Sequence, residues 1–235
     1  KMKNKILVTG GDGRFSKIFK EKNNSLNLVF KSKNQLNILK YDSIVKCIKK
    51  EKPKMIIHCA GLSRPMKLHE TNIYKSIDLN IIGTANVVKA CEKFRIKIIY
   101  ISTNYVYAGK KGNYSEREGV KPFNNYGWSK LGGECSVSMY KNSLILRVAM
   151  TEKPFAHVSA FTNLITNFIY HEEFVKYLPK LIKMRGIINV GGKKQSVYNF
   201  AKKQNESLKK AKAKNSDKLP LKQTMNLKLL KSILD

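Results

Sequence analysis

The stretch that most constrains the fold of this chain is residues 5–16. It reads KILVTGGDGRFS, an apolar run that meets a glycine-rich turn and then the start of a helical pattern at Phe15. A strand, a tight turn and a helix in this order leave backbone N–H groups at the helix N-terminus free to hold a pyrophosphate. Gly10 can take the unusual dihedrals of the turn, and Gly13 has no side chain to block the phosphates.

A glycine-rich turn by itself is weak evidence for a nucleotide site, because glycines also close ordinary loops. The spacing here is T-G-x-x-G-x-x-S, with the small Ser16 where a third glycine would let helix and strand pack closely. The motif also follows the first strand of the chain, where a nucleotide-binding βαβ unit usually starts. We therefore predict nucleotide binding over a plain turn.

The composition is that of a globular protein. The chain has 235 residues, 42% hydrophobic and 26% charged, which suits one α/β domain with a small lobe. Its four cysteines are widely spread and form neither a C-x-x-C pair nor a zinc spacing, so we expect reduced thiols and no metal site. The first apolar run is too short for a signal peptide and no run could span a membrane, so we expect a cytoplasmic protein without membrane contact.

The formal net charge of +30 allows two interpretations. Such a charge attracts polyanions, including nucleic acid. Lysine is, however, scattered through every segment together with many asparagines and isoleucines, which indicates a compositional bias. The sequence contains no recognisable nucleic-acid module, so we favour the compositional explanation and expect no nucleic-acid partner. A positive surface would still help to capture an anionic nucleotide.

The second predicted strand, residues 26–30, carries the choice of cofactor. An acidic residue at its end would bind the ribose 2′-OH of NAD, whereas a cation accommodates the 2′-phosphate of NADP. The next residues are Lys31-Ser32-Lys33, Arg14 lies in the glycine turn, and no carboxylate is near in sequence. This pattern favours NADP.

Further buried strands are predicted at residues 55–57, 96–101 and 143–148. Small residues (Cys59, Ala60 and Gly61) follow the first of these and leave room for a ligand at the carboxyl end of the sheet. The pattern predicts an α/β fold, a Rossmann-like doubly wound parallel sheet with a small, shortened C-terminal lobe. We place a nucleotide-binding domain at 1–150 and the lobe at 151–235, and leave open whether a late strand at 186–190 returns to the main sheet.

Helical patterns cover residues 76–94, where Asn80 interrupts the apolar side, and residues 161–170 and 174–184 in the lobe. Another helix opens with YGWSK at 126–130. Tyr126 and Lys130 stand four residues apart, so they share a helix face. An ammonium near a phenol lowers the pKa of the phenol, which makes Tyr126 a better proton donor and acceptor for carbonyl and alcohol chemistry.

Several motifs occur in an order that is specific as a set. They are TGGDGRFS at 9–16, IIHCAG at 56–61, YISTNYVY at 100–107, YGWSK at 126–130, LNIIGTANVVKAC at 79–91 and GIINVGG at 186–192. Over almost its whole length the chain resembles an extended short-chain dehydrogenase/reductase. It is most similar to the dTDP-4-dehydrorhamnose reductase group of NAD(P)-dependent sugar-nucleotide reductases and epimerases.

The resemblance implies hydride transfer from a nicotinamide cofactor to a keto carbon of a nucleotide-linked sugar. It makes Tyr126 the catalytic acid and base, Lys130 its partner and a contact of the nicotinamide ribose, and Thr103 the hydrogen-bond partner of the substrate carbonyl. Asn80 matches an asparagine with a structural or water-relay role. With Lys31 from the strand-end argument, the expected cofactor-binding residues are Gly10, Gly13, Arg14, Phe15, Lys31, Cys59, Ala60, Gly61, Asn80 and Lys130.

Three other functions stay open at this point. The first is an epimerase or dehydratase of the same superfamily, although Asn104 stands where a dehydratase would have an acidic residue. The second is a non-catalytic, NADP-binding regulatory protein, which the short region after residue 150 suggests. The third is a nucleic-acid binder, supported by charge alone. The resemblance also implies a homodimer, formed as a four-helix bundle through helices near 76–94 and 126–140.

Overall fold

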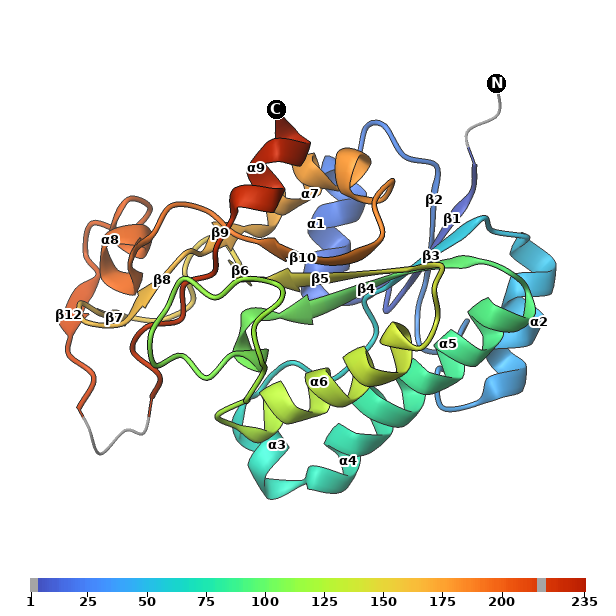
Figure 1. Ribbon diagram of the computed structural model, residues 1–235, viewed down its shortest axis with the longest axis horizontal. Helices are drawn as coiled ribbons and strands as arrows, with labels where there is room; N and C mark the ends of the chain where they lie inside the picture. The colour runs from blue at the N-terminus through green and yellow to red at the C-terminus, as the bar shows by residue number, and fades with distance from the viewer. Residues whose placement is uncertain (1–3, 215–218) are drawn as a thin grey trace.

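The computed structural model describes residues 4–214 and 219–235. A six-stranded, all-parallel sheet runs through the centre in the order β10-β5-β4-β3-β1-β2 (Figure 1). The strands are β1 (Ile6–Thr9), β2 (Leu28–Lys31), β3 (Met55–His58), β4 (Lys97–Thr103), β5 (Ser143–Val148) and β10 (Gly186–Val190). The order reverses after β2, because β3 pairs on the other side of β1. The predicted Rossmann-like, doubly wound fold is therefore confirmed.

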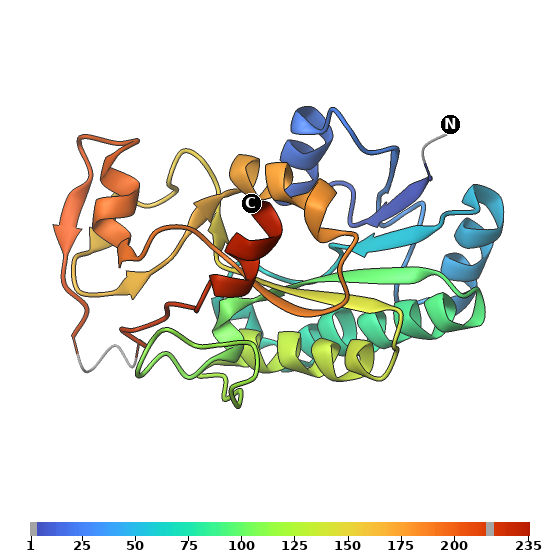
Figure 2. The ribbon, with the colours of Figure 1, turned by 45° about the horizontal axis from the view of Figure 1, so that its top comes forward.

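Alternation along the strands explains why helices cover both faces of the sheet. Ile6 and Val8 of β1 point into one apolar layer and Leu7 into the other. The first layer is closed by α1 (Arg14–Lys22), α7 (His171–Leu181) and α9 (Lys228–Leu234), and the second by α2 (Tyr41–Glu51), α5 (Gly83–Lys93) and α6 (Asn125–Ser138). Figures 1 and 2 show these two helix groups on opposite sides of the sheet.

The long helix predicted over residues 76–94 is interrupted. It consists of α4 (Ile73–Ile77), a single π-helical turn, η1 (Asp78–Ile82), and α5, and a short helix, α3 (Lys67–Thr71), precedes it. The π-turn lies where Asn80 enters the protein interior. Such turns often mark functional positions, because they redirect one side chain without ending the helix.

The C-terminal region divides between the main body and a small lobe. Helices α7 and α9 and strand β10 pack on the main sheet. The lobe has its own small core, which includes Leu164, Phe200 and Leu208. Its elements are β6 (Met150–Thr151), β7 (Ser159–Phe161), β8 (Ile165–Thr166), β9 (Ile169–Tyr170), β11 (Gln195–Ser196), α8 (Val197–Lys202) and β12 (Lys209–Ala211).

The helix predicted over residues 161–170 is wrong. Two short strands, β8 and β9, lie in this stretch, and they pair with β11 and β6. Apolar residues recur at helical intervals here, but their partners are strands that lie far away in the sequence. Among residues 4–214 and 219–235, no helix is long and apolar enough to cross a bilayer.

Candidate active site

The glycine turn lies between β1 and α1 and presses against the end of β3. Gly10 has φ +69°, and a Cβ at this position would lie 2.8 Å from the Ala60 Cα. Gly13 N donates to Gly10 O at 3.0 Å, and Gly13 then serves as the N-cap of α1. As a glycine, this N-cap has no side chain to bond the first N–H groups of α1. The N-terminal end of α1 therefore remains a place where an anion can bind.

Two buried polar side chains hold the ends of β1 and β3 together. Thr9 Oγ1 lies 2.7 Å from His58 Nδ1 and accepts a hydrogen bond from Ala60 N. His58 Nε2 lies 3.1 Å from Thr84 Oγ1 on α5. Burial lowers the pKa of His58 to about 3, so the ring is neutral at pH 7. His58 braces the backbone at Ala60.

Asn80 ties the loop after β3 to α6. Its amide nitrogen donates to Leu62 O at 2.9 Å and to Ser129 Oγ at 2.8 Å, and its oxygen accepts from Leu62 N at 2.7 Å. The amide oxygen is also only 2.7 Å from where a Cβ at Gly61 would lie. This geometry gives Asn80 a structural part. It also shows why a small residue is needed at Gly61.

The three expected catalytic residues come from β4 and α6. Thr103 ends β4, whereas Tyr126 and Lys130 lie on consecutive turns of α6, whose N-cap Asn124 accepts from Gly127 N at 2.9 Å. A hydrogen bond with Thr103 acts on the Tyr126 phenol. Lys130 Nζ donates to Ile101 O at 2.7 Å and lies 4.2 Å from the Tyr100 ring centroid. The fold thus brings these residues to the carboxyl edge of the sheet.

The pKa of Tyr126 differs from the prediction. Burial raises it to about 12, and the hydrogen bond from Thr103 and the charges of Arg64 and Arg14 oppose this only in part. Lys130 is not among the groups that lower the pKa of Tyr126, and its ammonium donates to the Ile101 carbonyl instead. The prediction that Lys130 lowers the pKa of Tyr126 is therefore wrong for this structure.

Lys130 itself lies in a desolvated position. Burial lowers its pKa to about 8, while the negative charge of Glu134 acts in the opposite direction. Burial raises the pKa of the Cys59 thiol to about 12, so this residue is a neutral thiol. The charge of Lys130 therefore changes near pH 8.

Two aromatic neighbours fix the ring of Tyr126, and the sequence reading missed both. The His69 ring centroid lies 5.1 Å from that of Tyr126, and the Tyr105 centroid lies at 5.7 Å with an edge-on geometry. His69 is buried on α3, and its Nδ1 lies 2.7 Å from Ser76 Oγ. Tyr105 lies inside the motif at 100–107, whereas no pattern in the sequence pointed to His69.

Lys31 does not match its expected environment. Its Nζ donates to Glu51 Oε1 at 2.7 Å, and Lys5 bonds the other oxygen of the same carboxylate. The expectation of a cation without a nearby carboxylate is therefore wrong, because the fold brings Glu51, at the end of α2, to this ammonium. Arg14 is the first residue of α1, directly after the glycine turn, and its side chain is 47% exposed.

Phe15 is placed for packing through its side chain. It is 8% exposed and contacts Phe19, Phe174 and His171, with ring centroids 5.3 to 5.6 Å away. Only the backbone of Phe15, in the first turn of α1, is suited to face a ligand. The expected cofactor contact of this residue can therefore come from its N–H group alone.

A buried ion pair lies behind Lys130 and was also missed. Arg147 of β5 bonds both carboxylate oxygens of Glu134 on α6, with N–O distances of 2.7 and 3.1 Å. Ser102 donates to the same carboxylate, and Arg147 donates to Tyr107 Oη, which in turn donates to Asn189 of β10. The network therefore ties α6 to three strands of the sheet.

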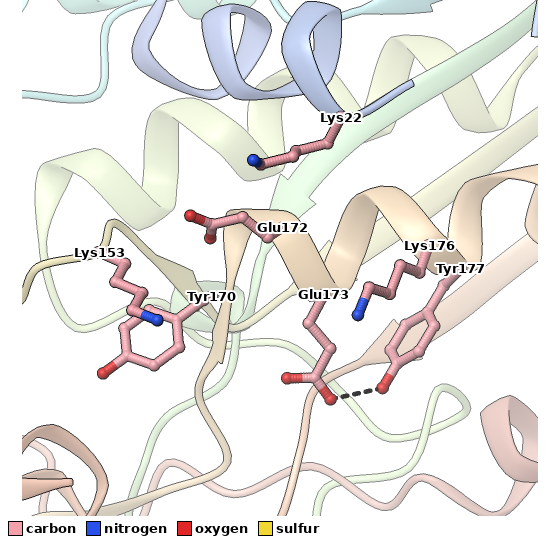
Figure 3. A pocket seen from close by; sticks show the side chains of 7 residues that line it. All are labelled: Lys22, Lys153, Tyr170, Glu172, Glu173, Lys176 and Tyr177. Atoms are coloured by element: carbon pink, nitrogen blue, oxygen red, sulfur yellow. Dashed lines mark hydrogen bonds between the residues drawn. The ribbon is translucent and has the colours of Figure 1, made fainter. Parts of the chain in front are cut away.

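A cavity of about 600 Å³ lies away from these residues, between α1 and the start of α7. Its lining consists of Lys22, Lys153, Tyr170, Glu172, Glu173, Lys176 and Tyr177 (Figure 3). Figure 3 shows the Tyr177 hydroxyl donating to Glu173, a bond of 2.7 Å. The cavity is separate from Thr103, Tyr126 and Lys130, none of which lines it. No cluster of three potential metal ligands occurs in the described parts of the chain.

Comparison with known proteins identifies the family. The family model "RmlD substrate binding domain" matches residues 3–186. The chain belongs to this family.

The chain is similar to two curated proteins, one of which is a subunit of an adenosyltransferase and the other a reductase. The methionine adenosyltransferase 2 subunit beta of Danio rerio is 32% identical over 154 residues, which are 61% of this chain and 47% of that protein. A dTDP-4-dehydrorhamnose reductase of Aggregatibacter actinomycetemcomitans is 26% identical over 191 residues, which are 79% of this chain and 60% of that protein. The chain spans about half the length of the first relative.

The fold matches a solved structure over most of both chains. The dTDP-4-dehydrorhamnose reductase of Bacillus anthracis, solved in complex with NADP, superposes with a TM-score of 0.88 at 23% identity. The match covers 98% of this chain and 93% of the other. At this identity the likeness establishes a shared fold, so the chemistry must be argued from the site itself.

Proposed function

We propose that the chain is an NADPH-dependent reductase that acts on a keto group of a nucleotide-linked sugar. The observation that carries this proposal is the convergence of Thr103, Tyr126 and Lys130 at the carboxyl edge of the sheet, beside the glycine turn. Membership of a family that contains dTDP-4-dehydrorhamnose reductases supports the substrate class. The cytoplasmic location expected from the sequence fits such an enzyme and stays a prediction.

A nicotinamide dinucleotide fits the residues present. The turn at Gly10 has no room for a side chain, and the N-terminus of α1 is capped only by Gly13, so backbone N–H groups can meet the diphosphate. Ala60 and Gly61 keep the end of β3 narrow, and Lys130 lies at the same edge. When bound, the nicotinamide supplies the hydride.

The residues of this chain then handle the proton and the carbonyl. Thr103 donates a hydrogen bond to the keto oxygen and holds the carbonyl in place. Tyr126 stays protonated because burial raises its pKa to about 12, so it can donate its proton to the oxygen as charge develops there. His69 and Tyr105 keep the phenol in one orientation. Lys130 provides a nearby positive charge when it is protonated, which stabilises the alkoxide-like transition state.

Preference for NADP over NAD forms part of the proposal. Two other cations lie near the glycine turn and the end of β2. Lys33 is exposed, and Arg14 lies 3.6 Å from Glu152, a longer contact than the one between Lys31 and Glu51. The B. anthracis neighbour was solved with NADP. A selective site should bind NADPH at least about tenfold more tightly than NADH, which corresponds to one extra charged contact.

The decisive experiment joins binding to turnover. Fluorescence titration with NADPH and NADH of the unmodified protein and of Gly13→Asp tests the glycine turn, since a carboxylate there would repel the diphosphate. Screening of 4-keto sugar nucleotides follows, with Tyr126→Phe as the matched variant that lacks only the hydroxyl. We expect selective NADPH binding, its loss in Gly13→Asp, and turnover that falls at least about 100-fold in Tyr126→Phe. Absence of binding of either cofactor at millimolar concentrations would overturn the proposal.

A second candidate function is that of a regulatory subunit that binds the cofactor without reaction. The match to methionine adenosyltransferase 2 subunit beta and the small C-terminal lobe favour it. The same titration separates the two, because a regulator binds NADPH but reduces none of the sugars. An epimerase would instead retain its cofactor through purification and interconvert sugars without net oxidation.

We infer further that the protein forms a homodimer through α4, η1 and α6. Exposed apolar side chains gather there, including Tyr74 at 78% and Trp128 at 51% exposure, with Ile73, Ile77 and Ile82. Helix α6 packs directly beside α4 and η1, so a second copy could bury this surface in a four-helix bundle. Analytical ultracentrifugation of the unmodified protein and of Tyr74→Glu tests it; a monomer in the unmodified protein contradicts it.

A further inference from the structure

Charged side chains from three elements meet at the mouth of the glycine turn. Arg14 begins α1, Arg64 lies in the loop after β3, and Glu152 directly follows β6. An Arg64 Nη donates to Glu152 Oε1, and the same oxygen lies 3.6 Å from Arg14 Nη1. A single carboxylate thus joins two guanidinium groups, one from the start of α1 and one from the loop after β3.

His171 provides a second and independent sign that a ligand belongs here. It is only 8% exposed, and its Nδ1 has no hydrogen-bond partner. Its ring packs edge-on against Phe15, the residue after Arg14, with the ring centroids 5.6 Å apart. Burial lowers the pKa of His171, and the charges of Glu152 and Arg14 also act on it. A buried polar atom without a partner is costly, and a ligand group that bonds to it removes that cost.

We propose that Arg14 and Arg64 form a clamp for a diphosphate group and that Glu152 occupies this clamp until the diphosphate arrives. The proposal rests on the proposed function, because the N-terminus of α1 supplies the other half of the diphosphate site. A guanidinium group binds carboxylate and phosphate oxygens with the same fork geometry. The Glu152 carboxylate therefore takes the place of the diphosphate at the two arginines, with a smaller negative charge.

The burial of the three side chains makes the exchange feasible. The side chain of Arg64 is 37% exposed, that of Arg14 47% and that of Glu152 24%. Ion pairs with this exposure contribute little to stability. The Glu152 carboxylate can therefore leave the arginines and be solvated by water at a small cost in free energy. A diphosphate beside Glu152 would repel it, since both would carry negative charge at the same two cations. Binding of the diphosphate and the presence of Glu152 in the clamp are therefore mutually exclusive.

Two ligands of the proposed reaction carry a diphosphate, namely the dinucleotide cofactor and the nucleotide sugar. Both present the same chemistry to the two arginines. The charges of Arg64 and Arg14 also act on the pKa of the Tyr126 hydroxyl. The experiment must therefore include one probe for each source.

The test is isothermal titration of the full chain with NADPH, with dTDP and with inorganic pyrophosphate. The variants are Glu152→Gln, Arg64→Gln and the control Glu92→Gln, which makes the same change in net charge on exposed Glu92 of α5, on the other face of the sheet. We expect Glu152→Gln to bind at least one probe about threefold or more tightly, Arg64→Gln to bind it more weakly, and the control to match the unmodified protein. In Arg64→Gln, the gain from adding Glu152→Gln should become smaller.

Each outcome has a distinct meaning. A tighter complex with NADPH assigns the clamp to the cofactor, and one with dTDP alone assigns it to the sugar nucleotide. Tighter binding of pyrophosphate without NADPH binding supports the clamp while overturning the proposed reductase. If Glu152→Gln binds no probe more tightly than Glu92→Gln does, the clamp proposal is wrong, even where NADPH binds normally.

Discussion

Two arrangements of arginine and glutamate in this molecule use the same charges in opposite ways. Glu134 and Arg147 lie behind Lys130 with side chains 3% and 5% exposed, and Ser102 and Tyr107 satisfy their remaining bonding groups. Glu152 meets Arg64 and Arg14 at the surface, where water reaches all three. The first arrangement is a permanent joint between α6 and the sheet, and the second can open for a ligand. Burial, and not the charges themselves, decides between these roles.

The largest difference should appear when one partner of the buried pair is removed. Glu134→Gln leaves Arg147 charged, buried and without its carboxylate, so we expect a loss of about 3 to 5 kcal/mol in the free energy of unfolding. Urea unfolding followed by circular dichroism measures it. The double variant Glu134→Gln/Arg147→Met should recover part of this loss, because no uncompensated charge remains. A loss below about 1 kcal/mol for Glu134→Gln would show that this pair behaves like a surface pair.

A buried group that titrates extends the comparison to pH. His58 has a folded pKa of about 3 against 6.5 in the reference state, so the unfolded chain binds the proton more readily. Stability from this group is therefore complete above pH 6.5 and declines as pH falls, by about 2 kcal/mol at pH 5. Urea unfolding at pH 6.5 and at pH 5 measures this decline. We expect the free energy of unfolding to change less between these two pH values in His58→Gln than in the unmodified protein. The remaining dependence comes partly from His69 and His171, whose pKa values burial also lowers.

Removal of one hydroxyl tests how far the buried network extends. Tyr107 Oη accepts from Arg147 and donates to Asn189 at 2.8 Å. Tyr107→Phe should therefore lower the free energy of unfolding by about 1 to 2 kcal/mol, since both partners lose a bond in a dry site. The matched control is Tyr41→Phe, because Tyr41 is half-buried and contacts Lys89 through its ring, which the substitution keeps. Equal effects of the two variants would contradict a network role.

The smallest effect on stability is expected at the surface cluster. Glu152→Gln removes a charge that is partly exposed to water, so the free energy of unfolding should change by less than about 1 kcal/mol. Urea unfolding in parallel with Glu134→Gln measures the contrast directly. A large loss in Glu152→Gln would mean that the cluster holds the lobe in place, and the comparison between joint and clamp would fail.

The sequence was most informative where local patterns determine structure. The strand, turn and helix at residues 5–16 follow from the apolar run and from Gly10. The turn requires a positive φ at this position, which glycine adopts readily. Three features were not accessible because they depend on tertiary contacts. Lys31 meets Glu51 across 20 positions, residues 161–170 take strand partners from distant segments, and the pKa of Tyr126 rises through burial. For the same reason Arg64 and Glu152, which are 88 positions apart, carried no signal.

The late position of β10 has a consequence for synthesis of the protein. This strand pairs with β5 along its full length and brings Asn189 to Tyr107, so the sheet cannot close until about residue 190 has emerged from the ribosome. Until then β5 is an exposed edge with a row of unpaired backbone groups, which other chains could extend. A nascent or truncated chain that stops near residue 150 therefore has an exposed, aggregation-prone edge at β5. Dependence on chaperones during translation should end only when β10 has paired with this edge.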